Sequence, residues 1–421
     1  MTAAVCVDVG STYTKACRVS LTTGEMTGRA EVPTTAASDV LAGLDQAVAA
    51  VGFAKTDHLY VCSSAGGGLR LAVVGYEALV TAEAGHRVGL SAGAQVVHVA
   101  SGLLDGRAVT ALRASRPDVI LLVGGTDGGD SSVLLHNAGR LATSRLRVPV
   151  VVAGNSDFSD DAASLLAARD ISVTVTSNVL PKIGVLDPGP ARAAIRDVFL
   201  RHVIGGKRLS KGGRFASLVR AATPDAVLAG VELLADLTGT GVLVVDVGGA
   251  TTDVYSALVP DAELTAGPRR DVAGTLWRSR TVEGDLGVAV GAPGTVAAAT
   301  AEKLALPETG QPPTPESDRS LAAAAAIVAL RRHARGHSPG AGQPRTGGRD
   351  LREVRLVVGS GGVLRHGGGQ YVLQAVLADT AGGWASPAGA RTVVDERYVL
   401  AAAGLLAIDH RDAAVALLNT L

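Results

Sequence analysis

The feature that most constrains this chain is a short pattern that occurs twice in its sequence. Each copy is an apolar, β-branched run that ends in Asp-Val-Gly, passes through small or hydroxyl residues and enters a second, alternating run. The copies lie at Asp8–Lys15 and Asp246–Asp253. A strand–turn–strand unit repeated so far along the chain predicts an internal duplication. We therefore expect two related halves that face each other.

The 421 residues allow two to three domains at about 150 residues each. Residues 3–33 predict a three-strand meander. A helix from Ser38 or Asp39 to Val51 and a buried strand at His58–Cys62 follow it. We predict a first domain at 1–238 and a second at 239–421.

Between about residues 80 and 180 the pattern changes to regular alternation of strands and helices. Predicted strands are Gln95–Ala100, Asp118–Val123, Pro149–Ala153 and Ile171–Thr176. These runs are continuously apolar and lie between helical segments, which is typical of a parallel sheet covered on both faces. We expect a parallel α/β insertion in the first domain.

The second domain carries two stretches rich in Pro, Gly, Ser and Arg, at 307–319 and 335–349. Their composition predicts mobile loops on either side of an alanine-rich helix at Leu321–Arg332. Beyond them, a predicted strand at Val354–Val358 runs directly into Gly-Ser-Gly-Gly at residues 359–362.

Composition excludes several classes of protein. Lys and Arg total 39, as do Asp and Glu, so the formal charge is zero and no basic stripe favours nucleic acid. No uncharged apolar run approaches the roughly 18 residues of a membrane span. The first residues carry no basic signal-peptide region, and the three cysteines are isolated. We expect a cytoplasmic protein that binds neither nucleic acid nor membrane.

The two Asp-Val-Gly hairpins carry residues suited to phosphate. A turn of glycine, serine and threonine offers backbone N–H groups and hydroxyls to phosphate oxygens. An aspartate beside it would repel phosphate unless Mg²⁺ or its waters lay between the two. One such hairpin is most simply a plain turn, whereas two in matching surroundings favour a paired metal-and-phosphate site.

Two further segments each have two interpretations. Gly359–Leu364 could expose backbone to a flat ring or to phosphate, or could be only a tight strand-to-helix turn. Leu364 breaks the Gly-x-Gly-x-x-Gly pattern, which disfavours a dinucleotide. Thr281–Gly287 places two carboxylates beside glycines, which fits either contact with metal or nucleotide, or a polar turn.

Three segments resemble, in order and spacing, the phosphate-1, phosphate-2 and adenosine motifs of the acetate and sugar kinase, Hsp70 and actin superfamily. They are Asp8–Lys15, Asp246–Asp253 and Gly359–Leu364, respectively. The resemblance implies an α/β fold of two ribonuclease-H-like (actin-like ATPase) domains around a nucleotide cleft, with ATP and Mg²⁺ as cofactors. It implies that Asp8 and Asp246 handle the metal. The candidate catalytic residues that would orient the attacking water are Asp8, Asp246 and Asp253. The implied nucleotide-binding residues are Gly10, Ser11, Thr12, Lys15, Gly248, Gly249, Thr251, Thr252, Gly359, Gly361 and Gly362.

A narrower resemblance rests on Val7–Lys15, Cys62–Arg70, Leu122–Gly129, Val245–Val254 and Thr281–Gly287. These segments look like the MutL (GlmL) family associated with glutamate mutase, also called methylaspartate mutase, and not like the mismatch-repair protein of that name. The resemblance implies an ATPase chaperone or reactivating factor for an adenosylcobalamin-dependent mutase. The alternatives are a nucleotide-stabilised scaffold that binds the mutase without hydrolysis, and a small-molecule kinase of the same fold.

Overall fold

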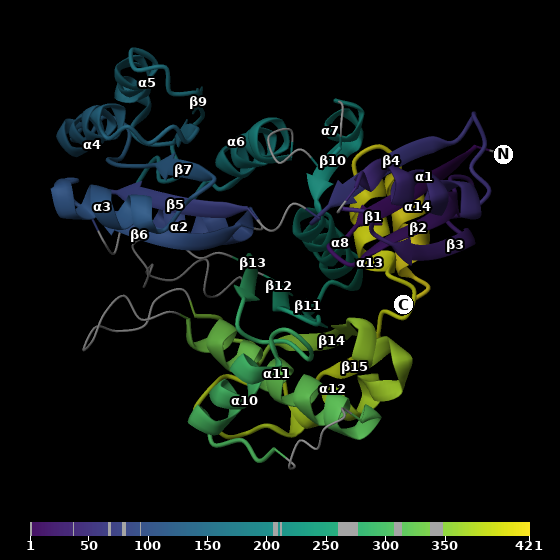
Figure 1. The fold of residues 1–421 in the computed structure, drawn as a ribbon. Coiled ribbons are helices and arrows are strands. Elements are labelled where there is room, and N and C mark those ends of the chain that lie inside the picture. Colours follow the sequence, from purple (N-terminus) through teal and green to yellow (C-terminus); the bar gives the residue numbers. More distant parts are fainter. Residues whose placement is uncertain are drawn as a thin grey trace. The chain divides into compact units, whose positions relative to one another are not determined.

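The computed structural model describes residues 2–421 apart from 37, 66–68, 78–80, 93, 205–208, 211–212, 260–276, 307–313 and 337–347. It divides into two compact units (Figure 1). One unit holds the described residues up to Asp225 apart from Thr23–Glu25, and the other holds Thr23–Glu25 and the described residues from Ala226 onward. This division falls within helix α8 (Thr223–Thr238), whereas the domain limits expected from the sequence, 1–238 and 239–421, stay a prediction.

The first unit begins with the predicted meander. Strands β1 (Ala3–Val9), β2 (Tyr13–Ser20) and β3 (Met26–Pro33) are antiparallel. Strand β4 (His58–Ser63) then pairs parallel to β1, and β10 (Val219–Ala222) pairs parallel to β4. The order is β10-β4-β1-β2-β3. Helix α1 (Val40–Ala50), capped by Asp39, packs its apolar side on the valines of β1.

The second unit repeats this sheet. Strands β11 (Gly241–Val247), β12 (Thr252–Ala257) and β13 (Arg278–Glu283) are antiparallel, and β14 (Val354–Ser360) and β15 (Arg391–Val394) continue in parallel from β11. The order β13-β12-β11-β14-β15 matches the first sheet strand for strand. The predicted duplication is therefore confirmed, and both sheets have the ribonuclease-H-like arrangement.

The helices of the second unit that follow β13 are α10 (Ala292–Ala301), α11 (Pro315–Arg335), α12 (Gly369–Ala378), α13 (Val399–Leu406) and α14 (Arg411–Leu418), with a short π-helical segment at Leu364–Gly368. Of these, α11 and α12 pack on the second sheet. Helix α11 buries alanine and aliphatic side chains against β11 and β12. No described helix is both long and apolar enough to cross a membrane.

The prediction of a loop up to residue 319 is wrong for 315–319, which form the first turn of α11. Thr314 caps this helix, Pro315 occupies its first position, and Ser317 completes a capping box with Thr314. Proline and hydroxyl residues that suggest a loop by composition are here a helix-start signal. The prediction is also wrong for residue 335, which is the last residue of α11. Residues 307–313 and 337–347 of the predicted loops lie outside the described residues.

The inserted sheet is wholly parallel, as expected. Its strands are β5 (Arg70–Gly75), β6 (Gln95–Ser101), β7 (Val119–Leu122), β8 (Val150–Val152) and β9 (Val173–Val175), in the order β6-β5-β7-β8-β9. This is the 2-1-3-4-5 order of flavodoxin-like sheets. The insertion was expected to begin near residue 80, so the prediction missed β5, a short apolar run without alternation. In the structure β5 lies between β6 and β7 in the sheet.

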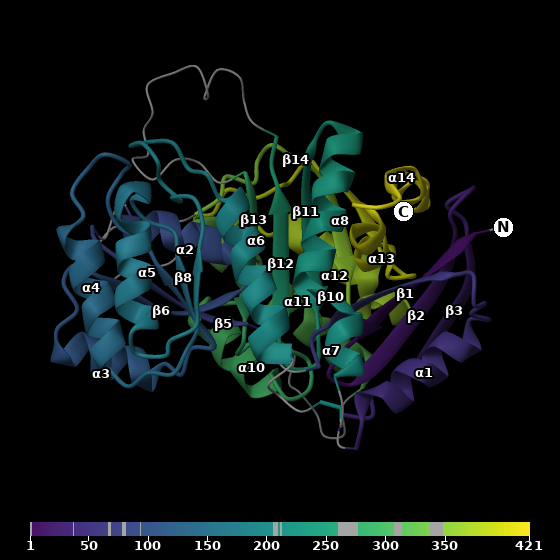
Figure 2. The same ribbon diagram turned by 90° about the horizontal axis from the view of Figure 1, so that it is seen from above.

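Helices pack on both faces of the inserted sheet, which Figures 1 and 2 show from two directions. One face packs against α2 (Thr81–Ser91) and α6 (Gly189–Val198), which continues into a π-helical segment at Phe199–Ile204. The other face packs against α3 (Gly106–Ala114), α4 (Ser132–Thr143) and α5 (Ser159–Ala167), the last preceded by a short 3-10 turn at Ser156–Phe158. Helix α7 (Arg214–Leu218) precedes β10.

Candidate functional site

The first candidate hairpin joins β1 to β2 directly after Asp8. Its turn is closed by the Gly10 amide, which donates to the Tyr13 carbonyl at 3.0 Å. A Cβ at Gly10 would lie 2.8 Å from that carbonyl oxygen, so only glycine fits this turn. Ser11 and Thr12 are exposed. The turn therefore offers backbone and hydroxyl donors without a bulky side chain in front of them.

The second hairpin, between β11 and β12, has the same geometry. The Gly248 amide donates to the Thr251 carbonyl at 2.9 Å, and a Cβ at Gly248 would lie 3.0 Å from that oxygen. Gly249 is exposed, as its counterpart Ser11 is. The duplication thus extends from the sheet order to a single backbone hydrogen bond in each turn.

Asp8 and Asp246 occupy matching positions near the ends of β1 and β11. Asp8 is half-buried, and its Oδ1 accepts from the Thr223 hydroxyl at 2.5 Å and from the Cys62 thiol at 3.7 Å. Burial and then the negative charge of Asp8 raise the pKa of the Cys62 thiol well above its usual value. Cys62 is therefore a neutral donor to the carboxylate. Lys15 lies opposite Asp8 in the β1–β2 ladder.

A buried arginine binds Asp253. The Arg280 guanidinium is 5% exposed and donates to Asp253 Oδ1 from Nε at 2.9 Å and from Nη2 at 2.5 Å. Asp253 lies opposite Asp246 in the β11–β12 ladder. The structure thus gives Asp253 a charge partner within its own unit.

The Gly-Ser-Gly-Gly loop lies at the carboxyl ends of β11 and β14, where Ser360 is the ladder partner of Asp246. Gly361 has a φ of +105°, and a Cβ on it would lie 2.1 Å from the Val247 carbonyl oxygen. A Cβ on Gly362 would meet nothing within 4 Å. The loop therefore crosses the strand end beside Asp246 with bare backbone. The carboxyl ends of parallel strands are where open α/β sheets bind ligands.

The segment after β13 packs on the second hairpin through backbone contacts. The amides of Val288 and Ala289 donate to the carbonyls of Gly248 and Gly249 at 3.1 and 2.8 Å. The Thr252 hydroxyl, predicted to bind nucleotide, is buried and donates to the Leu286 carbonyl at 3.1 Å. Thr252 therefore braces the turn from behind.

Both carboxylates of the Thr281–Gly287 motif bind one arginine of α11. Arg332 Nη1 lies 2.7 Å from Glu283 Oε2 and 2.7 Å from Asp285 Oδ1. Burial raises the pKa of Glu283 against the opposing effect of Arg332, whereas the hydrogen bond from Arg332 lowers the pKa of Asp285. In this structure the motif anchors the segment that supports the hairpin.

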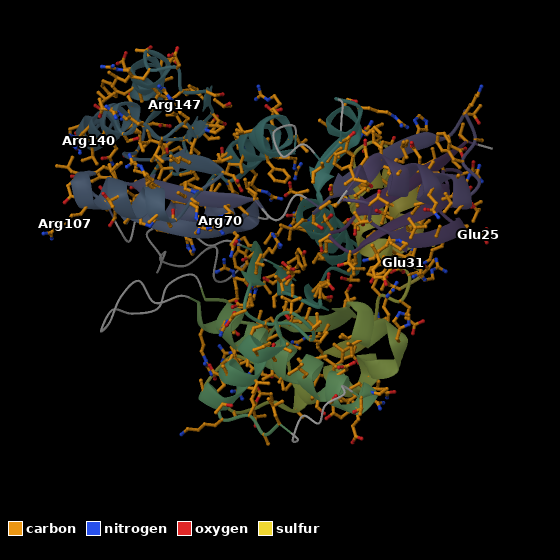
Figure 3. All side chains as sticks on the ribbon, in the orientation of Figure 1. Glu25, Glu31, Arg70, Arg107, Arg140 and Arg147 are labelled. Atoms are coloured by element: carbon orange, nitrogen blue, oxygen red, sulfur yellow. The ribbon has the colours of Figure 1, made fainter. Side chains whose placement is uncertain are left out.

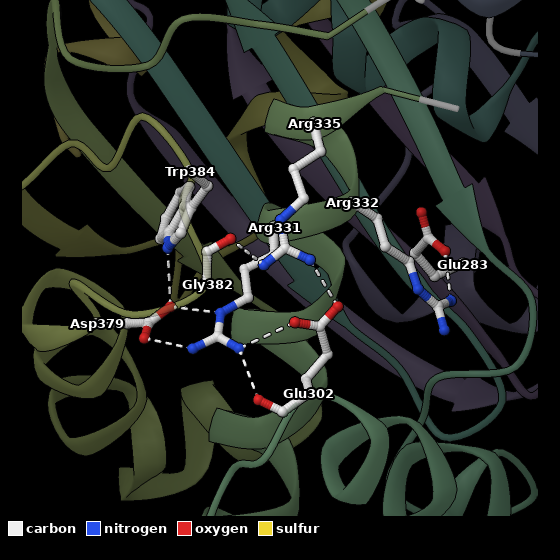
Figure 4. A network of polar contacts seen from close by, with 8 residues as sticks. All are labelled: Glu283, Glu302, Arg331, Arg332, Arg335, Asp379, Gly382 and Trp384. Atoms are coloured by element: carbon white, nitrogen blue, oxygen red, sulfur yellow. Dashed lines mark hydrogen bonds and ion pairs between the residues drawn. The ribbon is translucent and has the colours of Figure 1, made fainter. Parts of the chain in front are cut away.

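Adjoining residues at the end of α11 form a second polar network (Figure 4). The buried Arg331 donates to Asp379 at 2.8 and 2.6 Å and to the Glu302 carboxylate at 3.1 Å. Arg335 donates to the other Glu302 oxygen at 2.7 Å, and the Trp384 indole donates to Asp379 at 2.9 Å. These contacts tie α11 to the ends of α10 and α12.

The structure places the predicted site residues in two sets. Asp8, Gly10, Ser11, Thr12 and Lys15 belong to the first unit, while Asp246, Gly248, Gly249, Thr251, Thr252, Asp253, Gly359, Gly361 and Gly362 belong to the second. Sequence reasoning missed Thr223, Arg280 and Arg332, which bind the acidic residues of these sets. The two neighbouring carboxylates of the Thr281–Gly287 motif indicate that a cation binds them, but nothing in the sequence identifies Arg332 as that cation.

The sequence matches the family described as MutL protein over residues 4–313 and 305–421. It is 34% identical over 462 residues to Protein MutL of Clostridium tetanomorphum, a match that covers 100% of this chain and 99% of that protein. The chain belongs to the MutL family. The resemblance found in the motifs is confirmed.

One solved structure similar to this MutL family member is component A of the Acidaminococcus fermentans (R)-2-hydroxyglutaryl-CoA dehydratase. The two share 10% sequence identity with a TM-score of 0.33, and the match covers 98% of this chain and 100% of that chain. Another is the inorganic polyphosphate/ATP-glucomannokinase of Arthrobacter sp. strain KM, with 14% identity, a TM-score of 0.29 and full coverage of both chains. With TM-scores this low, the fold description rests on the sheet order given above.

Proposed function

We propose that this MutL family member is a cytoplasmic, ATP-binding accessory protein that hydrolyses ATP as a chaperone or reactivating factor for an adenosylcobalamin-dependent mutase such as glutamate mutase. The observation that carries the proposal is the pair of matching Asp-Val-Gly hairpins, each closed by the same backbone hydrogen bond. The mutase is named as the partner because the resemblance to the MutL family implies it.

The residues present fit ATP with Mg²⁺. Mg²⁺ ordinarily takes one or two carboxylates from a protein, and phosphate oxygens and water complete its shell. In this proposal Asp8 and Asp246 would each supply one carboxylate. Glycines 10 and 248 would leave the turn amides open to phosphate, and Gly361 would present bare backbone to the adenosine. Bound Mg²⁺ would neutralise negative charge on the phosphates.

The carboxylates take different roles in this proposal. Asp253 is bound by the buried Arg280, so its charge is already balanced within the unit. Asp8 accepts from a hydroxyl and a neutral thiol, neither of which cancels its charge. We therefore assign orientation of the attacking water to Asp8 or Asp246 and give Asp253 a supporting position.

Hydrolysis would act on the mutase by changing the relative stability of two arrangements of the protein. A nucleotide shifts such an equilibrium only by its difference in affinity for the two states. ATP and its products differ by the γ-phosphate, which is the group that the hairpins would hold. Loss of that phosphate is thus the event that would favour one arrangement over the other.

The test is phosphate release from ATP–Mg²⁺ with and without an adenosylcobalamin-dependent mutase, for the natural protein and for Asp246→Asn. Asp350→Asn is the matched control, because Asp350 is an exposed carboxylate that pairs with the nearby Arg352. We expect release that rises with the mutase, collapses in Asp246→Asn and is unchanged in the control. ATP binding without turnover would favour the scaffold, and a phosphorylated small molecule would favour the kinase.

A further inference from the structure

Six arginines gather where the chain enters the strands of the inserted sheet. We call this set the arginine edge: Arg70, Arg113, Arg116, Arg145, Arg147 and Arg169, of which Arg70 and Arg147 are labelled in Figure 3. All but Arg70 are exposed. The carboxylates described in the same entering segments are Asp118 and Asp170. With six positive and two negative charges, the arginine edge has a surplus of four positive charges.

The contacts that hold this edge leave its charge uncompensated. Arg70 Nη2 donates to the Ser115 carbonyl at 2.7 Å, Arg113 donates to the Ser144 carbonyl, and Arg147 donates to the Arg169 carbonyl. These acceptors are neutral peptide oxygens at the ends of α3, α4 and α5. Within the described part of the chain, none of the six forms an ion pair with a carboxylate.

Helix dipoles explain only part of this arrangement. Four helices, α2 to α5, end at this edge, and each C-terminus carries about half a negative charge. Their sum, about −2 charges, offsets about half of the surplus of four. The other half of the positive charge therefore remains to act on molecules outside the chain.

Two of these arginines occupy backbone positions that usually take glycine. Arg116 and Arg145 follow the ends of α3 and α4 with φ angles of 46° and 61°, in the left-handed region that strains residues with a Cβ. The same role after α1, α8 and α11 is taken by Gly52, Gly239 and Gly336. The chain thus keeps a long cation at two positions where glycine would fit with less strain.

We propose that the arginine edge docks an acidic, carboxylate-bearing surface of a partner protein. Guanidinium groups bind carboxylates with two parallel hydrogen bonds, which suits such a surface. Half-buried Leu146, Val148 and Pro149 lie among the arginines in the loop before β8. Arginine mixed with apolar surface is typical of protein interfaces, and the entering loops carry no aromatic side chain on which a base could stack.

Identifying the partner as the mutase rests on the proposed function, whereas the preference of this edge for carboxylates does not. The test variant of the full chain carries Arg116→Glu, Arg145→Glu and Arg169→Glu. Among the described residues these exposed side chains form no hydrogen bond or ion pair, so we expect the variant to fold. The charge-matched control reverses three exposed arginines elsewhere, Arg107, Arg352 and Arg355.

The measurement is the rate of association with an adenosylcobalamin-dependent mutase, and separately with poly-L-glutamate, at low and high salt. Electrostatic steering predicts at least about a tenfold lower rate for the test variant at low salt, and a smaller difference at high salt, where surface charges are screened. The control should associate like the natural protein. Equal rates for the test variant and the natural protein would overturn the proposal.

A second variant separates binding from folding. Arg116→Gly with Arg145→Gly relieves backbone strain, so the melting temperature should stay the same or rise while association slows. Unchanged association would mean that the arginines serve only the fold. Arginine-dependent binding of poly-L-glutamate without any binding of the mutase would support the surface and count against the proposed function. Arginine-dependent binding of duplex DNA that exceeds binding of poly-L-glutamate would overturn the choice of partner.

Discussion

Replacing Gly361 with alanine tests how the loop after β14 sits against β11. The added Cβ would lie 2.1 Å from the Val247 carbonyl oxygen, at a backbone φ of +105°. A strained backbone angle costs about 1–3 kcal/mol and overpacking against a rigid neighbour another 1–3, so the free energy of unfolding should fall by about 2–6 kcal/mol. The Val247 carbonyl cannot yield easily, because it belongs to a central strand.

Gly362→Ala is the matched control one residue away. Its Cβ would meet nothing within 4 Å, and its φ is not in the left-handed region. Because Gly362 opens a helical turn, alanine there should raise the free energy of unfolding by up to about 1 kcal/mol. The two variants add the same methyl group and differ only in what it meets.

The assay is urea unfolding of both variants, with and without ATP–Mg²⁺. Ligand at a hundred times its Kd stabilises a protein by about 2.7 kcal/mol, a gain that Gly361→Ala should lose because its loop is displaced. The reasoning is refuted if Gly361→Ala unfolds and binds ATP like the natural protein, or if both variants lose the same stability.

Three further predictions concern the end of α11. Arg331→Ala should lower the free energy of unfolding by about 3–5 kcal/mol, because it leaves Asp379 buried without its partner, whereas Arg335→Ala, at a more exposed site, should cost far less in urea unfolding. Arg332→Ala should slow phosphate release and leave the free energy of unfolding little changed, and Arg332→Lys should restore part of the rate. If phosphate release is equally slow in the alanine and lysine variants, Arg332 has no positioning role. Burial, followed by the charge of Arg349, lowers the pKa of His333 to about 3, so the histidine is neutral in the fold but becomes charged in the unfolded chain below about pH 6.5. Stability should thus fall as pH drops from about 6.5 toward 3, approaching 1.4 kcal/mol per unit, and His333→Gln should flatten that slope in melting curves.

The sequence predicted the parts of the fold that depend on local pattern. Both Asp-Val-Gly hairpins and the opening meander are found, because turn residues and alternation specify them locally. Strands β5, β10 and β15 were missed because they gain their stability from partners distant in the sequence. Their place in a sheet depends on neighbours rather than on their own residues.

In the candidate site as well, the sequence allowed some residues to be predicted and not others. Glycines 10, 248 and 361 could be chosen from sequence because close backbone approach leaves no alternative residue. The cations Arg280 and Arg332 could not, since an ion pair depends on which side chains the fold brings together. Both pair with carboxylates that the sequence had marked as candidates, so the structure changes the role of those carboxylates rather than their location.

Calorimetric titration of ATP–Mg²⁺ into the natural protein, Asp8→Asn, Asp246→Asn and the double variant tests most directly the proposal that both hairpins serve one ATP with its Mg²⁺. If both carboxylates serve one ion, each single variant should weaken binding by at least about tenfold, and the double variant should lose much less than the sum. Loss of affinity in one single variant with none in the other would contradict a shared site.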